Sequence, residues 1–350
     1  MKIVVTLLFW SLQALALNDD TGLKTSVAVD LVGQSRKEQT ETEKAFEARE
    51  VEFAFYAPID HLFNGVLMGA AHNENGESLF ELHEAYISSS RLVPRSRIKA
   101  GQFFIGLGRL NQTHRHDWLF TVAPKVHEEF FDEEGVLDSG MEYSYLLPTP
   151  FYLDVTFGVT TGHTYGHTHV SGSRPTVPNH YARFETYKGI SEQSGVNLGL
   201  NFLKRSNSAS EELEILGLDF LLKFKKSRHV PFLLQSEIWH RTITPKLGDA
   251  SKTLGAYFYP QYGISENLFI GLRLDGYSVL SRKNSISGEK VANLDHTISP
   301  SITYQPSEFS RFRLTYFTQQ SDVEGEKEFG DEGFYVQFTF ILGAHPAHDF

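Results

Sequence analysis

Apolar and polar residues alternate along most of this 350-residue chain. In the segment FYVQFTFIL (334–342), Phe334, Val336 and Phe338 alternate with Gln337 and Thr339. Because successive side chains of a strand point to opposite faces, a period of two predicts a strand with two different faces. About sixteen such segments are separated by turn-forming residues, near 24–34, 47–57, 65–72, 78–89, 95–105, 139–147, 150–161, 181–187, 193–204, 211–224, 231–242, 252–263, 267–279, 293–304, 309–320 and 333–343.

The connections between these segments are alternately short and long. The short ones are APIDHLF, RLVPR, LPTP, KGISE, KKSRHV, GISEN and QPSE. The long ones are polar and charged, and include SRKEQTETEKAF, GHTYGHTHVSGSRPTVPNH, ITPKLGDAS, SRKNSISGEKVAN and SDVEGEKEFGDE. Bacterial membrane barrels have short periplasmic turns, long extracellular loops and an even number of strands. The sequence therefore predicts an all-β fold, a transmembrane antiparallel β-barrel of about 16 strands.

The alternation also assigns the two faces of the clearer strands. The apolar members should meet lipid: Val51, Phe53, Phe55, Val155, Phe157, Val159, Leu268, Ile270, Leu272, Leu274, Phe312, Leu314 and Tyr316. The polar members should face the lumen: Glu50, Glu52, Asp154, Thr156, Arg273, Asp275, Arg311 and Arg313. An Arg or Lys on the lipid face costs about 2–4 kcal/mol at the midplane, so charges collect inside and predict a hydrated lumen. Six aromatic residues are candidates either for interfacial girdles or for filling the lumen: Tyr143, Tyr145, Trp239, Tyr257, Tyr259 and Tyr262.

The two ends of the chain indicate export. Residues 1–16 have a positive start, an apolar run and the small-residue site Ala14-Leu15-Ala16, which together predict a cleaved signal peptide and a barrel over 17–350. A membrane anchor is the alternative, but the run is too short to span a bilayer. The final strand, which ends on Phe350, resembles the assembly signal of bacterial outer-membrane barrels. That resemblance implies the bacterial outer membrane as location, with its lipid and the barrel assembly machinery as partners.

Composition narrows the function classes. The chain has no cysteine among its 350 residues, which excludes thiolate chemistry and zinc sites built on cysteine. Its formal net charge is -11, so a basic nucleic-acid-binding surface is not expected and no nucleic acid is predicted as a partner. An acidic channel would favour cations over anions.

The third long connection, 106–138, is the longest, and long loops are usually functional. In porins the third outer loop folds into the barrel and narrows it, and the position matches here. Its basic start would face its acidic end across a constriction, and opposed charges select solutes by charge and size. The predicted constriction residues are Arg109, His114, Arg115, His116, Asp117, Glu128, Glu129, Asp132, Glu133 and Glu134, with Arg273, Asp275, Arg311 and Arg313 of the strands. The alternative is a lid packed over the mouth by Trp118, Leu119 and Phe120.

Histidines cluster in two of the outer loops. The motifs HRH (114–116) and HTYGHTH (163–169) place imidazoles two or four residues apart. Residues two apart on an extended segment share a face, and three histidines with one open position suit zinc. The candidate metal ligands are His114, His116, His163, His167 and His169. No cofactor is required, and zinc would be a ligand or a transported ion. The alternative is that these histidines are solvated loop residues.

Enzymatic function is not expected. Three adjacent pairs combine histidine with a carboxylate: His83-Glu84, His116-Asp117 and Asp295-His296. Neighbours on a strand point to opposite faces, so adjacency alone does not make a catalytic dyad. Neither GxSxG, HExxH nor a phosphate-loop pattern occurs in the sequence.

Two stretches carry a resemblance to known proteins. The segments ELHEAYISSSRLVPRSRIKAGQFFIGLGRLNQTHRHDW (81–118) and FTFILGAHPAHDF (338–350) resemble plug-less, porin-like outer-membrane barrels related to zinc-regulated TonB-dependent receptors. The resemblance implies an outer-membrane location and a link to zinc. Such receptors carry a plug of well over a hundred residues, whereas fewer than ten residues separate the expected cleavage site from the first strand. Passive diffusion is therefore expected rather than energised transport.

Together these features predict a porin that passes small hydrophilic solutes, with cations preferred and zinc as a more specific hypothesis. Two other classes stay open. One is a non-conducting receptor or adhesin barrel, and the other is an outer-membrane enzyme. Sixteen-stranded porins are often trimers, so a homotrimer is compatible with the sequence, although it marks no interface.

Overall fold

The computed structural model describes residues 22–38, 45–74, 77–162, 177–206, 211–281, 293–323 and 326–344. The predicted signal peptide (1–16) and the histidines at 163, 167 and 169 lie outside the described residues, as does the terminal Phe350. Within them, no helix is long and apolar enough to cross a membrane.

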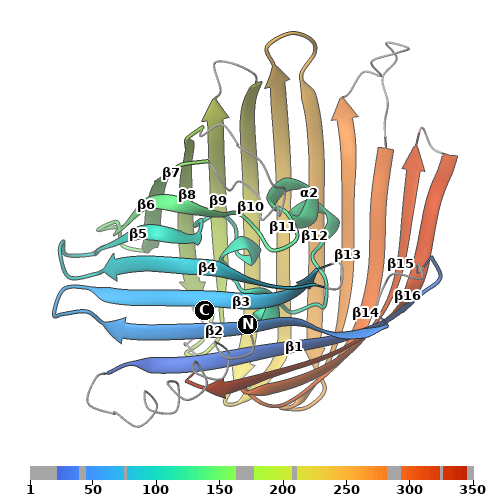
Figure 1. The fold of residues 1–350 in the computed structure, drawn as a ribbon, viewed down its shortest axis with the longest axis horizontal. Coiled ribbons are helices and arrows are strands. Elements are labelled where there is room, and N and C mark those ends of the chain that lie inside the picture. Colours follow the sequence, from blue (N-terminus) through green and yellow to red (C-terminus); the bar gives the residue numbers. More distant parts are fainter. Residues whose placement is uncertain are drawn as a thin grey trace.

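Sixteen antiparallel strands form one closed barrel (Figure 1), as predicted. Each strand pairs with its neighbours in sequence, and β1 pairs with β16 to complete the ring. The strands are β1 (Lys24–Arg36), β2 (Phe46–Pro58), β3 (Asn64–Glu74), β4 (Glu77–Ser89), β5 (Ser96–Phe104), β6 (Leu137–Leu146), β7 (Tyr152–Thr160), β8 (Asn179–Gly189), β9 (Gly195–Ser206), β10 (Glu211–Lys226), β11 (His229–Pro245), β12 (Ser251–Gly263), β13 (Leu268–Ser281), β14 (Asn293–Ser307), β15 (Ser310–Val323) and β16 (Glu326–Gly343).

The last hairpin differs from the sequence prediction. A long outer connection is predicted over 321–332, but β15 and β16 remain paired as far as Val323 and Glu326. Only residues 324–325 lie between the two strands. Backbone pairing needs an apolar face only where a strand crosses an apolar layer, so a charged hairpin can continue beyond it without alternation.

The two faces of the wall follow the predicted alternation. On β13 and β15, Leu272 and Leu314 are exposed on the outer face, whereas Arg273 and Arg313 are each 3% exposed on the inner face. Val155 keeps the outward parity of its strand but is buried between its cross-strand neighbours Tyr145 and Phe184. Because large apolar side chains are exposed all along the outer face, the barrel presents an apolar exterior and keeps its charges inside.

The six aromatic candidates divide between the two faces. Trp239, Tyr257 and Tyr259 are each 1% exposed and belong to the buried interior cluster. Tyr143 and Tyr262 are exposed on the outside of the wall. The lumen-filling alternative is therefore confirmed for three of the six, and the girdle alternative stays a prediction for the two that lie on the outer face.

The third loop enters the barrel. Residues 105–136 leave β5 and return to β6, and they contain η2 (Leu110–Gln112), η3 (Arg115–Asp117) and α2 (Lys125–Phe131). The β14–β15 turn lies at the opposite rim, because connections alternate between rims in an up-and-down barrel. Arg311, the second residue of β15, nevertheless donates to the His116 carbonyl. The loop therefore reaches deep into the lumen, and it is not a lid over the mouth.

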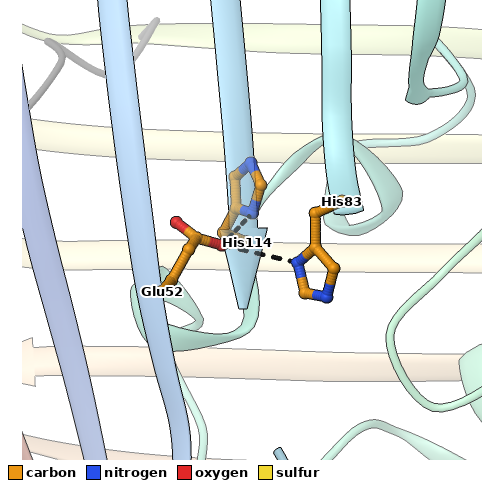
Figure 2. Close-up of side chains that lie close together, drawn as sticks. All are labelled: Glu52, His83 and His114. Atoms are coloured by element: carbon orange, nitrogen blue, oxygen red, sulfur yellow. Dashed lines mark ion pairs between the residues drawn. The ribbon is translucent and has the colours of Figure 1, made fainter. Parts of the chain in front are cut away.

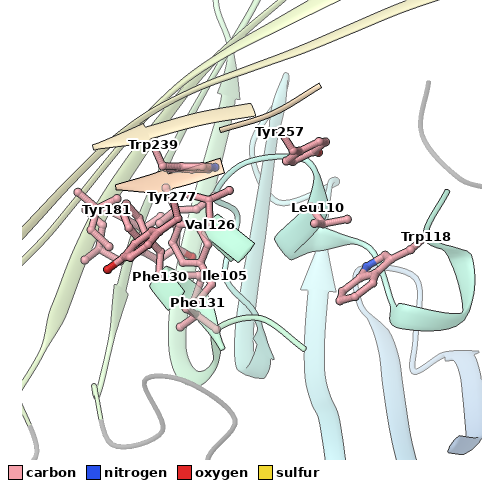
Figure 3. Packing of buried hydrophobic residues seen from close by; sticks show 14 of the residues in the cluster. Ile105, Leu110, Trp118, Val126, Phe130, Phe131, Tyr181, Trp239, Tyr257 and Tyr277 are labelled. Carbon is pink, nitrogen blue, oxygen red and sulfur yellow. The ribbon is translucent and has the colours of Figure 1, made fainter. Parts of the chain in front are cut away.

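Apolar side chains of the loop cover one half of the inner wall. Trp118 and Phe120 are buried, and the Phe120 ring lies 5.6 Å from the rings of both Tyr257 and Tyr259. The Phe131 ring packs edge-on against Trp239 at 4.7 Å. Figure 3 shows Phe130 and Phe131 gathered beside Trp239 and Tyr277. This half of the lumen is a packed core, where the sequence predicts water.

One glycine allows this packing. Gly108 has a positive φ of 62°, and an added Cβ would lie 2.6 Å from the Trp239 ring and 3.1 Å from a Glu237 carboxylate oxygen. Both the backbone conformation and the space therefore require glycine.

We expect Gly108→Ala to lower the free energy of unfolding by about 1–3 kcal/mol, because the methyl group overpacks the Trp239 contact. The measurement is urea unfolding of the detergent-refolded barrel. Gly276→Ala is the matched control, since its Cβ would meet only the Asp295 carbonyl oxygen at 3.5 Å. Equal stability of the two variants would contradict the packing described for Gly108.

Candidate functional site

A bulge in β4 turns two adjacent residues inward. Met68 of β3 pairs with Glu84, and the next residue, Gly69, pairs with Leu82. His83 is the extra residue, so it and Glu84 both lie on the inner face, 2% and 7% exposed. The expectation that neighbours on a strand point apart is therefore wrong at this position, because a bulge changes the side-chain parity.

A second bulge lies in β2. Asp30 of β1 pairs with Glu50, and Leu31 pairs with Ala48, which leaves Arg49 as the extra residue. Arg49 and Glu50 consequently both face inward, and the Arg49 guanidinium donates to Asp30 through Nε at 2.8 Å. The two bulges therefore add one inward cation and one inward imidazole to the same side of the lumen.

Imidazoles and carboxylates meet between these strands and the third loop. Nδ1 of His114 lies 2.8 Å from Oε2 of Glu52, and its Nε2 lies 3.2 Å from Oε2 of Glu84. Nδ1 of His83 lies 3.6 Å from the same Glu52 oxygen. Figure 2 shows the His83 and His114 rings both directed at the Glu52 carboxylate. Loop and wall are therefore joined by ion pairs that are almost entirely buried.

The opposite nitrogen of His83 faces a second group. Its Nε2 lies 3.0 Å from Nε2 of His72 and 3.6 Å from Oε2 of Glu134. Nδ1 of His72 lies 3.7 Å from the other Glu134 oxygen, which also pairs with Arg115 at 3.2 Å. His83 therefore stands between two carboxylates, one from the wall and one from the end of the loop.

His116 occupies a third position in the cluster. Its Nε2 lies 3.1 Å from Oδ2 of Asp117, and its Nδ1 lies 3.7 Å from Oε1 of Glu52. This adjacent pair can meet because η3 is a turn of 3-10 helix, in which neighbours are not held on opposite faces. The strand argument against adjacent dyads therefore does not apply to the loop.

Two loop histidines have opposite protonation tendencies. Burial opposes a charge on His114, but the carboxylates of Glu52 and Glu84 outweigh it and raise its pKa well above the ordinary range. Burial and the charge of Arg115 lower the pKa of His127 to about 3. His114 is therefore an ion-pair partner, whereas His127 is a neutral ring that packs edge-on against Trp118 at 5.6 Å.

Arginines of the wall hold the loop by its carbonyl groups. Four inward guanidinium groups from β2, β13 and β15 each donate to one carbonyl: Arg49 to Thr121, Arg273 to Val122, Arg311 to His116 and Arg313 to Trp118. The Arg313 bond measures 3.0 Å, and this side chain also donates to Gln337 at 2.8 Å. Buried carbonyls need hydrogen-bond donors, and these guanidinium groups supply them.

Carboxylates of the wall hold the loop by its N–H groups. One oxygen of Glu237 accepts from the backbone N–H of Arg109 at 2.9 Å and of Leu110 at 2.7 Å. Asp275 accepts from the N–H of Lys125 at 3.0 Å, at the start of α2. Carboxylates of the wall thus accept from the loop's N–H groups, and arginines of the wall donate to the loop's carbonyl groups.

The predicted constriction residues lie in or around the lumen, but they do not form two rows facing each other across an opening. Arg115 pairs with Glu133 and Glu134 of its own loop, at 3.4 and 3.2 Å. Glu128 and Glu129 are more exposed and pair with Lys125 on α2, at 3.3 and 3.0 Å.

The remaining constriction residues have local partners. Asp132 follows α2 with a positive φ of 74°, and its Oδ1 accepts from the N–H of Glu133 at 2.8 Å. Arg273 pairs with Asp275 at 2.8 Å. Arg109 is half-buried and is positioned by its backbone bond to Glu237. Most of these charges therefore fix the loop in place.

Of the predicted metal ligands, the structure brings together His114 and His116, whose rings lie 5.8 Å apart. It adds six residues that the sequence analysis did not select as ligands: Glu50, Glu52, His72, His83, Glu84 and Glu134. Inward parity could have selected Glu52 from its strand. His83 depends on the bulge, which alternation does not reveal.

Three sets in this cluster have donor atoms close enough to hold an ion: Glu52 with His83 and His114, His72 with His83 and Glu134, and Glu50 with Glu52 and His116. In each set the donor atoms lie within 4.8 Å of one another.

The barrel resembles solved outer-membrane structures. An anion-selective porin from Comamonas acidovorans superposes with a TM-score of 0.63 at 10% identity, covering 91% of this chain and 99% of that one. The fold is that of an outer-membrane porin. OprB of Pseudomonas putida gives 0.61 at 10% identity, over 96% and 97%. The outer membrane channel DcaP of Acinetobacter baumannii gives 0.59 at 11% identity, over 91% and 96%.

Sequence comparisons add little beyond this fold. No protein-family model matches the chain. An uncharacterized protein of Aquifex aeolicus is 25% identical over 341 residues, covering 88% of this chain and 70% of that protein. The porin-like part of the resemblance is supported by the solved structures, whereas a link to zinc-regulated TonB-dependent receptors is not.

We expect Arg313→Gln to loosen the third loop, because the Trp118 carbonyl loses a buried charged donor worth about 1–3 kcal/mol. The measurement is the rate of trypsin cleavage after Arg109, Arg115 and Lys125 in the folded barrel, which should rise. Arg205→Gln is the control, since Arg205 forms an outlying pair with Glu211 at 3.7 Å. If both variants resist trypsin as well as the wild type, the arginine anchor is not needed.

Proposed function

We propose that this chain is a porin-like channel of the bacterial outer membrane, which passes small hydrophilic solutes by passive diffusion and prefers cations. The observation that carries the proposal is the inward third loop, which is bonded to both halves of the wall. A loop that narrows a closed barrel, with charged groups beside it, is a structure that sorts solutes by size and charge. The porin-like fold of the similar structures supports this function.

The preference for cations rests on the polar half of the lumen. Six carboxylates lie there around Arg115 and the buried histidines: Glu50, Glu52, Glu84, Asp117, Glu133 and Glu134. Of the four arginines that donate to loop carbonyls, Arg49 lies on β2 beside these carboxylates and is paired with Asp30, and the other three lie on β13 and β15. The formal net charge of -11 acts in the same direction at longer range.

The membrane partners are part of the same proposal. The exposed apolar residues of the outer face would contact the lipid of the outer membrane. The barrel assembly machinery would recognise the final strand. A homotrimer is the assembly we expect from porin-like barrels. We propose no enzymatic activity.

A non-conducting receptor or adhesin barrel is the second candidate. One observation favours it: inner-face polar residues such as Asn201 and Asp219 are 0% and 1% exposed, although they lie on the lumen side. In a wide water-filled pore such residues would be exposed to solvent. The channel proposed here is therefore narrow, and release of the loop should widen it.

We expect the refolded wild-type barrel to give small, stable conductance steps in a planar bilayer, with a reversal potential that shows cation preference. The double variant Arg311→Gln/Arg313→Gln should give steps about twofold larger or more, because two carbonyls of the loop lose their donors. Arg205→Gln should match the wild type. If the folded wild-type protein gives no steps, the channel is refuted and the receptor function takes its place.

A further inference from the structure

Three buried side chains of the polar cluster come from separate parts of the chain. His72 lies on β3, His83 is the bulge residue of β4, and Glu134 lies where the third loop returns to β6. They are 7%, 2% and 8% exposed. None of them is among the arginines and carboxylates that hold the loop backbone, so channel architecture alone does not account for this group.

Nε2 of His83 has the separations from His72 and Glu134 that ligands around one ion have, and one donor atom from each of the three residues lies within 4.8 Å of the others. Zinc–nitrogen and zinc–oxygen bonds of about 2.0–2.2 Å place adjacent ligands of a tetrahedral site roughly 3.3 Å apart. Nε2 of His83 lies 3.0 Å from Nε2 of His72 and 3.6 Å from Oε2 of Glu134. We propose that His72, His83 and Glu134 form a binding site for a divalent transition-metal ion, with Zn²⁺ the best match.

Neighbouring residues supply the outer support that such sites use. Nδ1 of His83 faces the Glu52 carboxylate at 3.6 Å, so the imidazole has a carboxylate behind it while Nε2 faces the ion. Arg115 pairs with Glu134 at 3.2 Å and orients its carboxylate. Two imidazoles and one carboxylate leave the fourth position for water or a solute group.

The two alternative donor sets are less suitable. His114 has both ring nitrogens against carboxylates, at 2.8 and 3.2 Å, which is an ion-pair arrangement rather than an open ligand. His116 directs Nε2 to Asp117 at 3.1 Å. The loop histidines predicted from the HRH motif therefore serve as neighbours of the metal site, and its ligands come largely from the wall.

The donor set also selects the type of ion. Nitrogen ligands suit zinc and similar transition metals, whereas calcium and magnesium prefer sites made of oxygen. The chain reaches solvent next to the site, because Glu133, which directly precedes Glu134, is 70% exposed. Binding would tie the returning end of the third loop to β3 and β4, so the ion would also stabilise the loop inside the barrel.

The test is calorimetric titration of chelator-treated, detergent-refolded full-length barrel with Zn²⁺. The expected result is one tight site per chain and no tight site for Ca²⁺ or Mg²⁺. His72→Asn, His83→Gln and Glu134→Gln should each weaken Zn²⁺ binding by about tenfold or more. The triple variant His163→Ala/His167→Ala/His169→Ala and the single variant His180→Ala should bind like the wild type.

A spectroscopic measurement distinguishes loss of the metal site from misfolding of a variant. Co²⁺ added to wild-type barrel should give the intense visible absorption of a four-coordinate site, and unlabelled Zn²⁺ should displace it. Variants that keep the heat-modifiable mobility of a folded barrel should lose this absorption. Absence of a tight wild-type site overturns the proposal, and so does loss of binding only in the 163/167/169 variant. Because binding is measured without a membrane, this result is independent of whether the barrel conducts.

Discussion

An irregular loop inside a barrel must have its backbone groups satisfied there, and this constraint organises the whole interior. Buried N–H and C=O groups without partners cost free energy comparable to a lost hydrogen bond, and no bulk water reaches them. The strands of the wall supply two kinds of side chain as partners for these groups. Carboxylates such as Glu237 and Asp275 accept from loop N–H groups, and arginines such as Arg49 and Arg313 donate to loop carbonyls. The inward charges that alternation places in the lumen are thereby largely used for structure.

The loop also divides the lumen into two unlike halves. Towards β8–β13 it packs aromatic and aliphatic side chains against Trp239, Tyr257 and Tyr259, and these contacts are as buried as any protein core. Towards β2–β4 it presents His114, Arg115 and Glu134 to a wall of carboxylates and imidazoles. The apolar half fixes the loop, and the polar half is the surface available for ions. The proposed narrow channel and the proposed metal site both rest on this arrangement.

Two bulges make the polar half possible. Strict alternation would place His83 and Glu84 on opposite faces, and likewise Arg49 and Glu50. The extra residue in β4 and in β2 removes that restriction, and it concentrates four functional side chains over two short segments. Bulges thus convert a regular strand into a site without changing the number of strands or the closure of the barrel.

Much of the fold follows from the sequence, because a strand in an apolar layer has a period of two and an up-and-down barrel sorts its connections by length. Alternation determined the sixteen strands, the outward Leu272 and the inward Arg273. It fails at the bulges of β2 and β4 and where β16 begins early in a charged hairpin. The position of the third connection also predicted its entry into the lumen. Tertiary structure alone decided which groups the charges meet. The partners of Arg311 and Arg313 are loop carbonyls, and a loop backbone has no sequence pattern that marks it as an acceptor. The meeting of His72, His83 and Glu134 depends on a bulge, a hairpin register and the return path of a long loop, three features that are set by packing in space and not by the order of residues along the chain.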